Sequence, residues 1–217
     1  MEASLIPSLD VRVVAFCLLQ ERLHVLLCAA SGDGECFELP GAPVPLTRSL
    51  EETATCLLSQ LTGIRETYLE QLYTYGEPAR ANPRLISVVY FALLPASRLY
   101  GAPHPSAGWW AVEALPPLTG DHAEIIAYAM RRLRYKLEYS AVGFQLLPER
   151  FTLSELQRIY EMILGEKLDK RNFRRRILQA GIIEATAECR TGEGRPARLY
   201  RYRPDAVAEV KARRLFP

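Results

Sequence analysis

The residues best placed to do chemistry lie in one stretch, 40–64, where a loop containing proline and glycine leads into a helical pattern. Glutamates one helical turn apart could hold a divalent cation, which needs several hard oxygen ligands to act on a phosphate group. The stretch has only two acidic residues, Glu51 and Glu52, and both fall in the first helical turn, where acids favour the helix dipole. Ser49 stands three residues before Glu52, which predicts a capping box. We therefore expect both glutamates to be structural.

The same stretch resembles a degenerate Nudix box, the loop–helix motif with which Nudix hydrolases hold metal ions and cleave diphosphates. The frame of the motif is present at Pro40-Gly41 and at Thr62-Gly63-Ile64. Its metal-ligand positions are occupied here by Arg48, Leu57, Gln60 and Leu61. The resemblance implies a Nudix-like fold, and the lost carboxylates imply no catalytic residue, no bound metal and no cofactor.

Charge is distributed unevenly along the 217 residues, although the net charge is only +2. Residues 1–130 carry 7 basic and 14 acidic residues, a net charge of −7, whereas residues 131–217 carry 20 and 11, a net charge of +9. This contrast predicts two domains with different partners, the second of them nucleic acid. There is no signal-peptide pattern, no long apolar run and no CxxC among the five cysteines, so we expect a cytoplasmic protein with reduced, buried thiols and no membrane partner.

The first part of the chain combines strands with two helices. Apolar and β-branched runs predict strands at 11–19, 23–29, 36–39, 68–75, 85–94 and 109–112. Helical spacing of apolar residues predicts helices at 50–62 and 121–139. A mixed sheet with one inserted and one closing helix suits an α/β/α sandwich. Of the adjacent Trp109 and Trp110, we expect one to be a core residue. For His122 we expect a capping or core role.

The rest of the chain predicts a winged helix-turn-helix. Thr152 with Glu155 forms a capping box that begins one helix, and Asp169 caps a second helix with the basic sequence KRNFRRRIL. Residues 182–189 and 198–203 predict a hairpin, the wing. Three apolar residues of the second helix are expected to face inward: Phe173, Ile177 and Leu178. The fold class is therefore α+β, a Nudix-like sandwich followed by a winged helix.

A basic helix fits the major groove of DNA, where its N-terminal residues reach base edges and flanking arginines meet phosphates. Asn172 could pair with adenine, and Arg171 or Arg174 with guanine. The candidate DNA-binding residues are Thr152, Ser154, Lys170, Arg171, Asn172, Arg174, Arg175, Arg195 and Arg198. One winged helix covers one half-site, so we expect a homodimer on a palindromic operator in double-stranded DNA. The alternatives are a solvated basic appendage and an RNA-binding winged helix.

Nearly the whole chain resembles the Nudix-related transcriptional regulators, which join a Nudix-like domain to a C-terminal winged helix. The segments DHAEIIAYAMRRLRYKLEYS, FTLSELQRIYEMILGEKLDKRNFRRRIL and GEGRPARLYRYRP carry the resemblance, and residues 69–94 resemble Nudix domains that recognise ADP-ribose. It implies a repressor in which an inactive domain, residues 1–142, senses a nucleotide metabolite such as ADP-ribose, and residues 143–217 bind DNA. The family often regulates NAD metabolism, and other members sense sugars, which leaves a sugar effector open.

The resemblance also directs attention to effector contacts in the first domain. Arginines could pair with a diphosphate in bidentate fashion, and aromatic rings could stack on a base. Arg48, which replaces a Nudix-box glutamate, could substitute for the charge of the metal. The candidate ligand-binding residues are Arg48, Tyr75, Arg80, Arg84 and Trp109. Two other readings are an interaction protein whose basic domain meets an acidic partner, and an active hydrolase with metal ligands drawn from Glu51, Glu52, Glu66 and Glu70.

Overall fold

The computed structural model describes residues 6–30, 35–80, 84–99, 104–191 and 196–203. Within these ranges no helix has the length and apolarity that a membrane crossing requires. The chain forms two compact units, the first made of Met1–Leu94 and Arg98–Ala129 and the second of Pro95–Ser97 and Met130–Pro217. The division falls inside a long helix, and the domain boundary at 142/143 stays a prediction.

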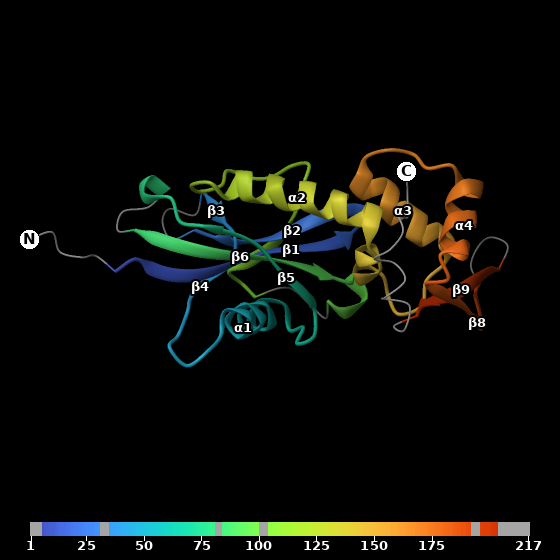
Figure 1. The fold of residues 1–217 in the computed structure, drawn as a ribbon, viewed down its shortest axis with the longest axis horizontal. Coiled ribbons are helices and arrows are strands. Elements are labelled where there is room, and N and C mark those ends of the chain that lie inside the picture. Colours follow the sequence, from blue (N-terminus) through green and yellow to red (C-terminus); the bar gives the residue numbers. More distant parts are fainter. Residues whose placement is uncertain (1–5, 31–34, 81–83, 100–103, 192–195, 204–217) are drawn as a thin grey trace, which may run out of the picture. The chain divides into compact units, whose positions relative to one another are not determined.

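The first unit is built on a mixed sheet in which β3, β2, β1, β6 and β5 follow one another (Figure 1). Two further strands extend it, since β4 pairs with β1 and β7 pairs with β2. β1 and β6 are parallel, whereas the other pairs are antiparallel. The strands are β1 (Ser8–Leu19), β2 (Arg22–Ala29), β3 (Phe37–Glu38), β4 (Gly41–Pro43), β5 (Tyr68–Tyr75), β6 (Leu85–Leu94) and β7 (Ala107–Ala111).

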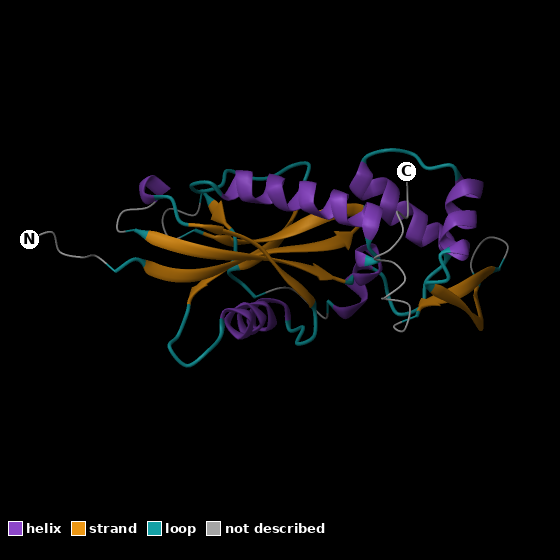
Figure 2. Ribbon diagram, viewed as in Figure 1, coloured by secondary structure: helices purple, strands orange, loops and turns teal. Residues whose placement is uncertain are grey.

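Helices cover both faces of this sheet, α1 (Leu50–Thr62) on one side and the first part of α2 (His122–Tyr139) on the other (Figure 2). α1 begins at Ser49, whose predicted capping box with Glu52 is present, and ends at Gly63 in the left-handed conformation. The apolar residues at helical spacing in α2 are all buried: Ile125, Ile126, Ala129, Leu133 and Leu137. The predicted α/β/α sandwich is confirmed.

The second unit contains the predicted winged helix. Its elements are the 3-10 segment Val142–Leu146, helices α3 (Leu153–Leu164) and α4 (Lys170–Gln179), and the antiparallel hairpin of β8 (Ile183–Arg190) and β9 (Ala197–Tyr202). Thr152 caps α3 through a capping box with Glu155, and Asp169 caps α4. Tyr160 of α3 is buried against Phe173 of α4, with ring centroids 5.6 Å apart. Local capping and apolar burial between the two helices thus stabilise the helix pair.

Several expectations about burial were wrong. Leu178 is 50% exposed, because α4 turns only Phe173 and Ile177 into the core. Trp109 and Trp110 are both half-buried, since β7 lies at the edge of the sheet, where Trp110 meets Phe37 edge to face. Of the cysteines only one is fully buried, and burial raises its pKa to about 12: this is Cys17. Cys28 and Cys56 are half-buried, and Cys36 and Cys189 are exposed.

Candidate functional site

The acidic residues of the helix that resembles a Nudix box, Glu51 and Glu52, lie in its first turn. No group of three histidine, cysteine or acidic side chains that could hold a metal is present in the described residues. At the ligand positions, Leu61 is buried and Gln60 is exposed. Glu52 is committed to the cap, because its Oε2 accepts the Ser49 N–H at 2.8 Å. This hydrogen bond lowers the pKa of Glu52, so the expected structural role of Glu52 is confirmed.

An open groove of about 590 Å³ runs along the solvent side of α1. Glu51 and Glu52 line it together with Arg65, so the charged residues of its lining are acidic on balance. Arg48 lies beside this helix with an exposed side chain, and its Nη1 donates to the Sγ of Cys56 at 3.4 Å. The positive charge that replaces a box glutamate is therefore accessible to solvent.

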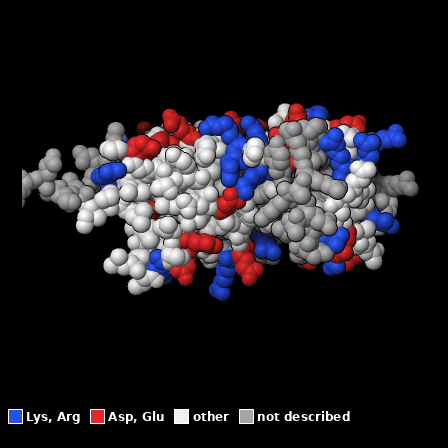
Figure 3. Space-filling view, viewed as in Figure 1, with Lys and Arg blue, Asp and Glu red and all other residues white. Residues whose placement is uncertain are grey.

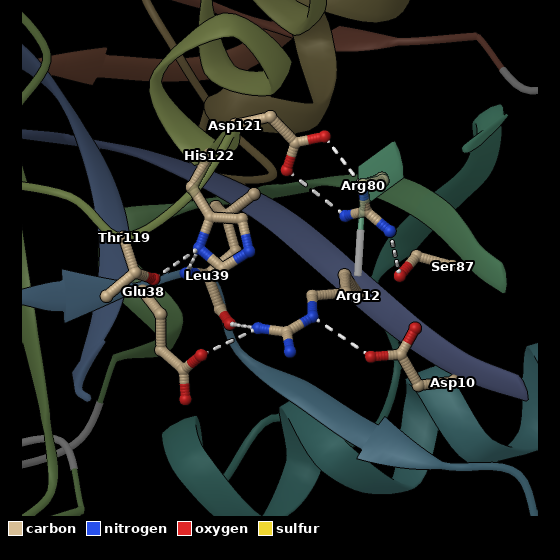
Figure 4. Close-up of polar contacts among 9 residues, drawn as sticks. All are labelled: Asp10, Arg12, Glu38, Leu39, Arg80, Ser87, Thr119, Asp121 and His122. Atoms are coloured by element: carbon tan, nitrogen blue, oxygen red, sulfur yellow. Dashed lines mark hydrogen bonds and ion pairs between the residues drawn. The ribbon is translucent and has the colours of Figure 1, made fainter. Parts of the chain in front are cut away.

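A partly buried polar cluster lies on the face of the sheet that α2 covers (Figure 4). At its centre, Arg12 of β1 donates from Nε to Asp10 Oδ2 at 3.1 Å and from Nη1 to Glu38 Oε2 at 2.9 Å. The same Nη1 donates to the carbonyl of Leu39 at 3.2 Å. One guanidinium therefore connects β1 to β3 and to the start of the loop that precedes α1.

A second ion pair closes the other side of this cluster. Arg80 donates from Nε to Asp121 Oδ2 at 2.6 Å, and its Nη1 donates to Ser87 Oγ at 2.7 Å. Its guanidinium also lies over the ring of Tyr75, 5.5 Å from the centroid. Burial alone would raise the pKa of Asp121, but its hydrogen bonds and charge interaction with Arg80 outweigh burial and lower it. His122 is buried beside them, and its Nδ1 accepts the Leu39 N–H at 3.2 Å, so the expected core role of His122 is confirmed.

The predicted ligand-binding residues do not form one group. Tyr75, Arg80 and Arg84 lie together where β5 leads into β6, and Arg84 Nη2 donates to the carbonyl of Gly76 at 3.1 Å. Trp109 lies on β7 at the opposite edge, with β2, β1 and β6 in between. Arg48 belongs to the loop between β4 and α1. Their roles toward a ligand stay predictions.

The buried ion pairs were not anticipated from the sequence, although a signal for one was present. Asp10 and Arg12 are two residues apart in an apolar strand, so both side chains face the same side of the sheet. Charged residues on a covered face are almost always paired. The pairing of Arg80 with Asp121 carried no such local signal, because 41 positions separate them.

The predicted DNA-binding residues gather around α4 and the hairpin. Lys170, Arg171 and Arg175 are exposed on α4, and Arg175 Nη2 donates to Asn172 Oδ1 at 2.9 Å. Figure 3 shows Lys and Arg atoms over this part of the second unit. The remaining members are Thr152 and Ser154 at the start of α3, Arg174 on α4 and Arg198 on β9. Arg195 lies outside the described residues.

Comparison with known sequences gives matches over both parts of the chain. The model of the NrtR DNA-binding winged helix domain matches residues 143–202. The ADPR responsive transcriptional repressor NtrR of Acinetobacter baylyi is 36% identical over 206 residues, which are 90% of this chain and 82% of that protein.

Solved structures of one relative match the two parts as well. NrtR of Shewanella oneidensis, complexed with a 27mer DNA, is 34% identical with a TM-score of 0.82, over 92% of this chain and 95% of that chain. The NUDIX domain of the same relative, in a cocrystal with ADP ribose, is 30% identical with a TM-score of 0.52, over 59% of this chain and 89% of that chain. Both parts thus have a counterpart of the same fold within one protein.

Proposed function

This chain belongs to the NrtR family of Nudix-related transcriptional regulators, and from that premise we propose that it is a repressor that binds double-stranded DNA and responds to ADP-ribose. The observation that carries the proposal is the match, over 90% of the chain, to an ADPR responsive transcriptional repressor. We propose that residues 1–142 bind the effector and that residues 143–217 bind DNA. Since these relatives are bacterial, the proposed place of action is the cytoplasm, where bacterial DNA lies.

The exposed basic face of α4 supports DNA binding by this chain. The N-terminal part of a recognition helix reads base edges in the major groove, and here that part offers Arg171, Asn172 and Arg175. One winged helix covers one half-site, so the proposed assembly is a homodimer on a palindromic operator.

For the effector, the arginines where β5 leads into β6 are the proposed diphosphate contacts. Arg84 is exposed, whereas Arg80 is already paired with Asp121, so a phosphate at Arg80 must share or replace that carboxylate. Tyr75 offers a ring to a base. A ligand touching both Tyr75 and Trp109 would have to span four strand spacings, about 19 Å, so Trp109 is a separate prediction from this group.

The proposal includes no hydrolase activity, because a sensor gains from retaining its ligand. Arg48 then supplies the positive charge that a metal supplies in the hydrolases. Arg48→Ala should weaken ADP-ribose binding about tenfold, roughly 1.4 kcal/mol, and EDTA should leave the affinity of the unmodified protein unchanged. Isothermal titration calorimetry measures both effects.

The exposed Arg98 of the same unit provides the control, since Arg98→Ala should bind as the unmodified protein does. Strict Mg²⁺ dependence of ADP-ribose binding would contradict the role given to Arg48. Release of phosphate products from ADP-ribose with Mg²⁺ or Mn²⁺ would show an active hydrolase instead.

The regulator itself is tested by selecting bound DNA from a random duplex pool at about 150 mM salt, near physiological ionic strength, and then titrating ADP-ribose into the selected complex. We expect an enriched palindrome whose complex responds to ADP-ribose. A palindrome that responds only to a sugar would retain the regulator and replace its effector. Failure to enrich any sequence would contradict the proposal and favour the interaction-protein reading.

A further inference from the structure

A cleft of about 440 Å³ in the second unit lies between the starts of α3 and α4 and strand β9. Three cationic residues line it, Lys170, Arg174 and Arg198, and the described lining residues include no carboxylate. Ser154 and Tyr200 add hydroxyl groups. The cleft is therefore positively charged and lined by hydrogen-bond donors, which suits an anion.

Arg174 is held in this cleft with an unused donor. Its Nη2 donates to Ser154 Oγ at 3.3 Å, whereas its buried Nε meets no acceptor in the described part of the chain. A buried guanidinium N–H without an acceptor is unfavourable. The guanidinium of Arg174 nevertheless lines the cleft, and the Nη groups of arginine are strong donors to the oxygens of an anion.

The first turn of α3 adds backbone donors on the same side. Leu153 and Ser154 line the cleft, and their N–H groups have no acceptor among the described residues. The capping box uses other groups, since Thr152 Oγ1 accepts the N–H of Glu155 at 3.2 Å. The dipole of the 12-residue helix reinforces the attraction for an anion at this end.

Carboxylates near the cleft are already engaged. Glu155 accepts the Thr152 N–H at 2.7 Å and pairs with Arg190 of β8. Asp169 accepts the Asn172 N–H at 2.7 Å. The three cations of the cleft therefore have no carboxylate partner in the described residues, in contrast to Arg12 and Arg80 of the first unit.

The spacing along α4 separates its basic residues into two faces. Lys170 and Arg174, one turn apart, both line the cleft. Arg171 and Arg175, also one turn apart, do not line it, and Arg175 contacts Asn172 instead. From this division we propose that the cleft holds one phosphate of the DNA backbone, while the face with Arg171 and Arg175 meets the bases. The proposal rests on the DNA-binding function proposed above and assigns a phosphodiester to one site within it.

The salt dependence of DNA binding tests this assignment. In the full chain, Lys170→Gln and Arg198→Gln should each reduce the slope of log affinity against log salt, and the double variant should reduce it by about 0.9, the value for one lost phosphate contact. Each variant should weaken binding to the selected site and to random duplex by the same factor, because phosphate contacts carry no sequence information. Arg201→Gln on the same strand is the matched control, since Arg201 pairs with Glu184 and does not line the cleft. Its slope should equal that of the unmodified protein.

A neutral methylphosphonate, placed at single backbone positions of the selected site, identifies the phosphate. The unmodified protein should lose affinity at one position in each half-site, and Lys170→Gln should lose less at that position, because only Arg174 and Arg198 still face the phosphate there. Unchanged salt slopes in both cleft variants would contradict the phosphate site but not the proposed DNA-binding function. Failure to select any DNA site would contradict the DNA-binding function itself. A different outcome is that inorganic phosphate stabilises the unmodified protein but not Lys170→Gln, with the salt slopes unchanged. That result would assign the cleft to a free phosphate and overturn the proposal.

Discussion

Arg12→Met should lower the free energy of unfolding of the first unit by about 3 kcal/mol. Removing one partner of a buried ion pair costs roughly 3–5 kcal/mol, because the remaining charge is left uncompensated. The side chains of Arg12 and Asp10 are 16% and 11% exposed, whereas Glu38 is 30% exposed and partly screened by water, which places the expected loss at the lower end. Methionine retains the apolar stem, so the change isolates the charge and its hydrogen bonds.

Urea unfolding followed by tryptophan fluorescence measures this loss. The chain has two tryptophans, and both lie on β7, so the signal reports on the first unit. Asp10 Oδ1 is buried without a donor in the described residues, so the Asp10 carboxylate depends on Arg12. Adding Asp10→Asn to Arg12→Met should therefore restore about 1 kcal/mol or more. The exposed Arg98→Met is the control, with an expected change within about 0.5 kcal/mol. A single Arg12→Met variant as stable as this control would contradict the role given to the cluster.

The cluster also contacts the chain where it passes from β3 to β4, ahead of the loop before α1. Arg12 bonds the side chain of Glu38 and the carbonyl of Leu39, just before Pro40 and Gly41. A Cβ atom at Gly41 would lie 3.0 Å from the guanidinium carbon of Arg12. A larger residue at this first position of β4 would therefore require the guanidinium of Arg12 to shift. The segment before α1 is thus tied to the sheet by the contacts of Arg12 and by the pairing of β4 with β1.

The elements that sequence predicts best are those defined by local chemistry. α1 is observed at the expected residues because Ser49 and Glu52 cap one end, and Gly63 adopts the left-handed conformation that ends the helix. The same reasoning holds for Thr152 and Asp169 in the second unit. These signals lie within a few residues of the boundary that they set, so no knowledge of the tertiary structure is needed.

Features that depend on distant partners were not predictable in the same way. β4 has only three residues, and it exists because Gly41–Pro43 pair with the first part of β1. Trp109 shares a strand pair with Leu26, which places it at the sheet edge away from Tyr75. Strand pairing across such separations leaves no periodicity in the sequence. For the same reason the charge of α4 predicted an anionic partner, whereas the division of its arginines into two faces required the cleft beside Arg198.

His122 should make the stability of the first unit depend on pH between 5 and 6.5. Burial lowers the pKa of His122 to about 4, and the positive charges of Arg12 and Arg80 also lower it. The carboxylates of Glu38 and Asp121 raise it, but by less. A proton on Nδ1 would also remove the acceptor of the Leu39 N–H. The unfolded chain has an ordinary histidine pKa of about 6.5. As the pH falls below that value, the unfolded state takes up a proton that the folded state does not, so stability decreases.

The slope approaches about 1.4 kcal/mol per pH unit below pH 6.5, which gives an expected decrease of about 1.6 kcal/mol from pH 6.5 to 5. The lowered pKa values of Asp121 and Glu52 act at lower pH, because a carboxylate of this kind loses its contribution only below about pH 4. Urea unfolding at several pH values, read by the same tryptophans, measures the slope. His122→Asn, whose side-chain oxygen can accept the Leu39 N–H, should remove most of the slope, whereas the exposed His104→Asn should retain it. Equal slopes in both variants would show that groups other than the buried imidazole of His122 cause the pH dependence.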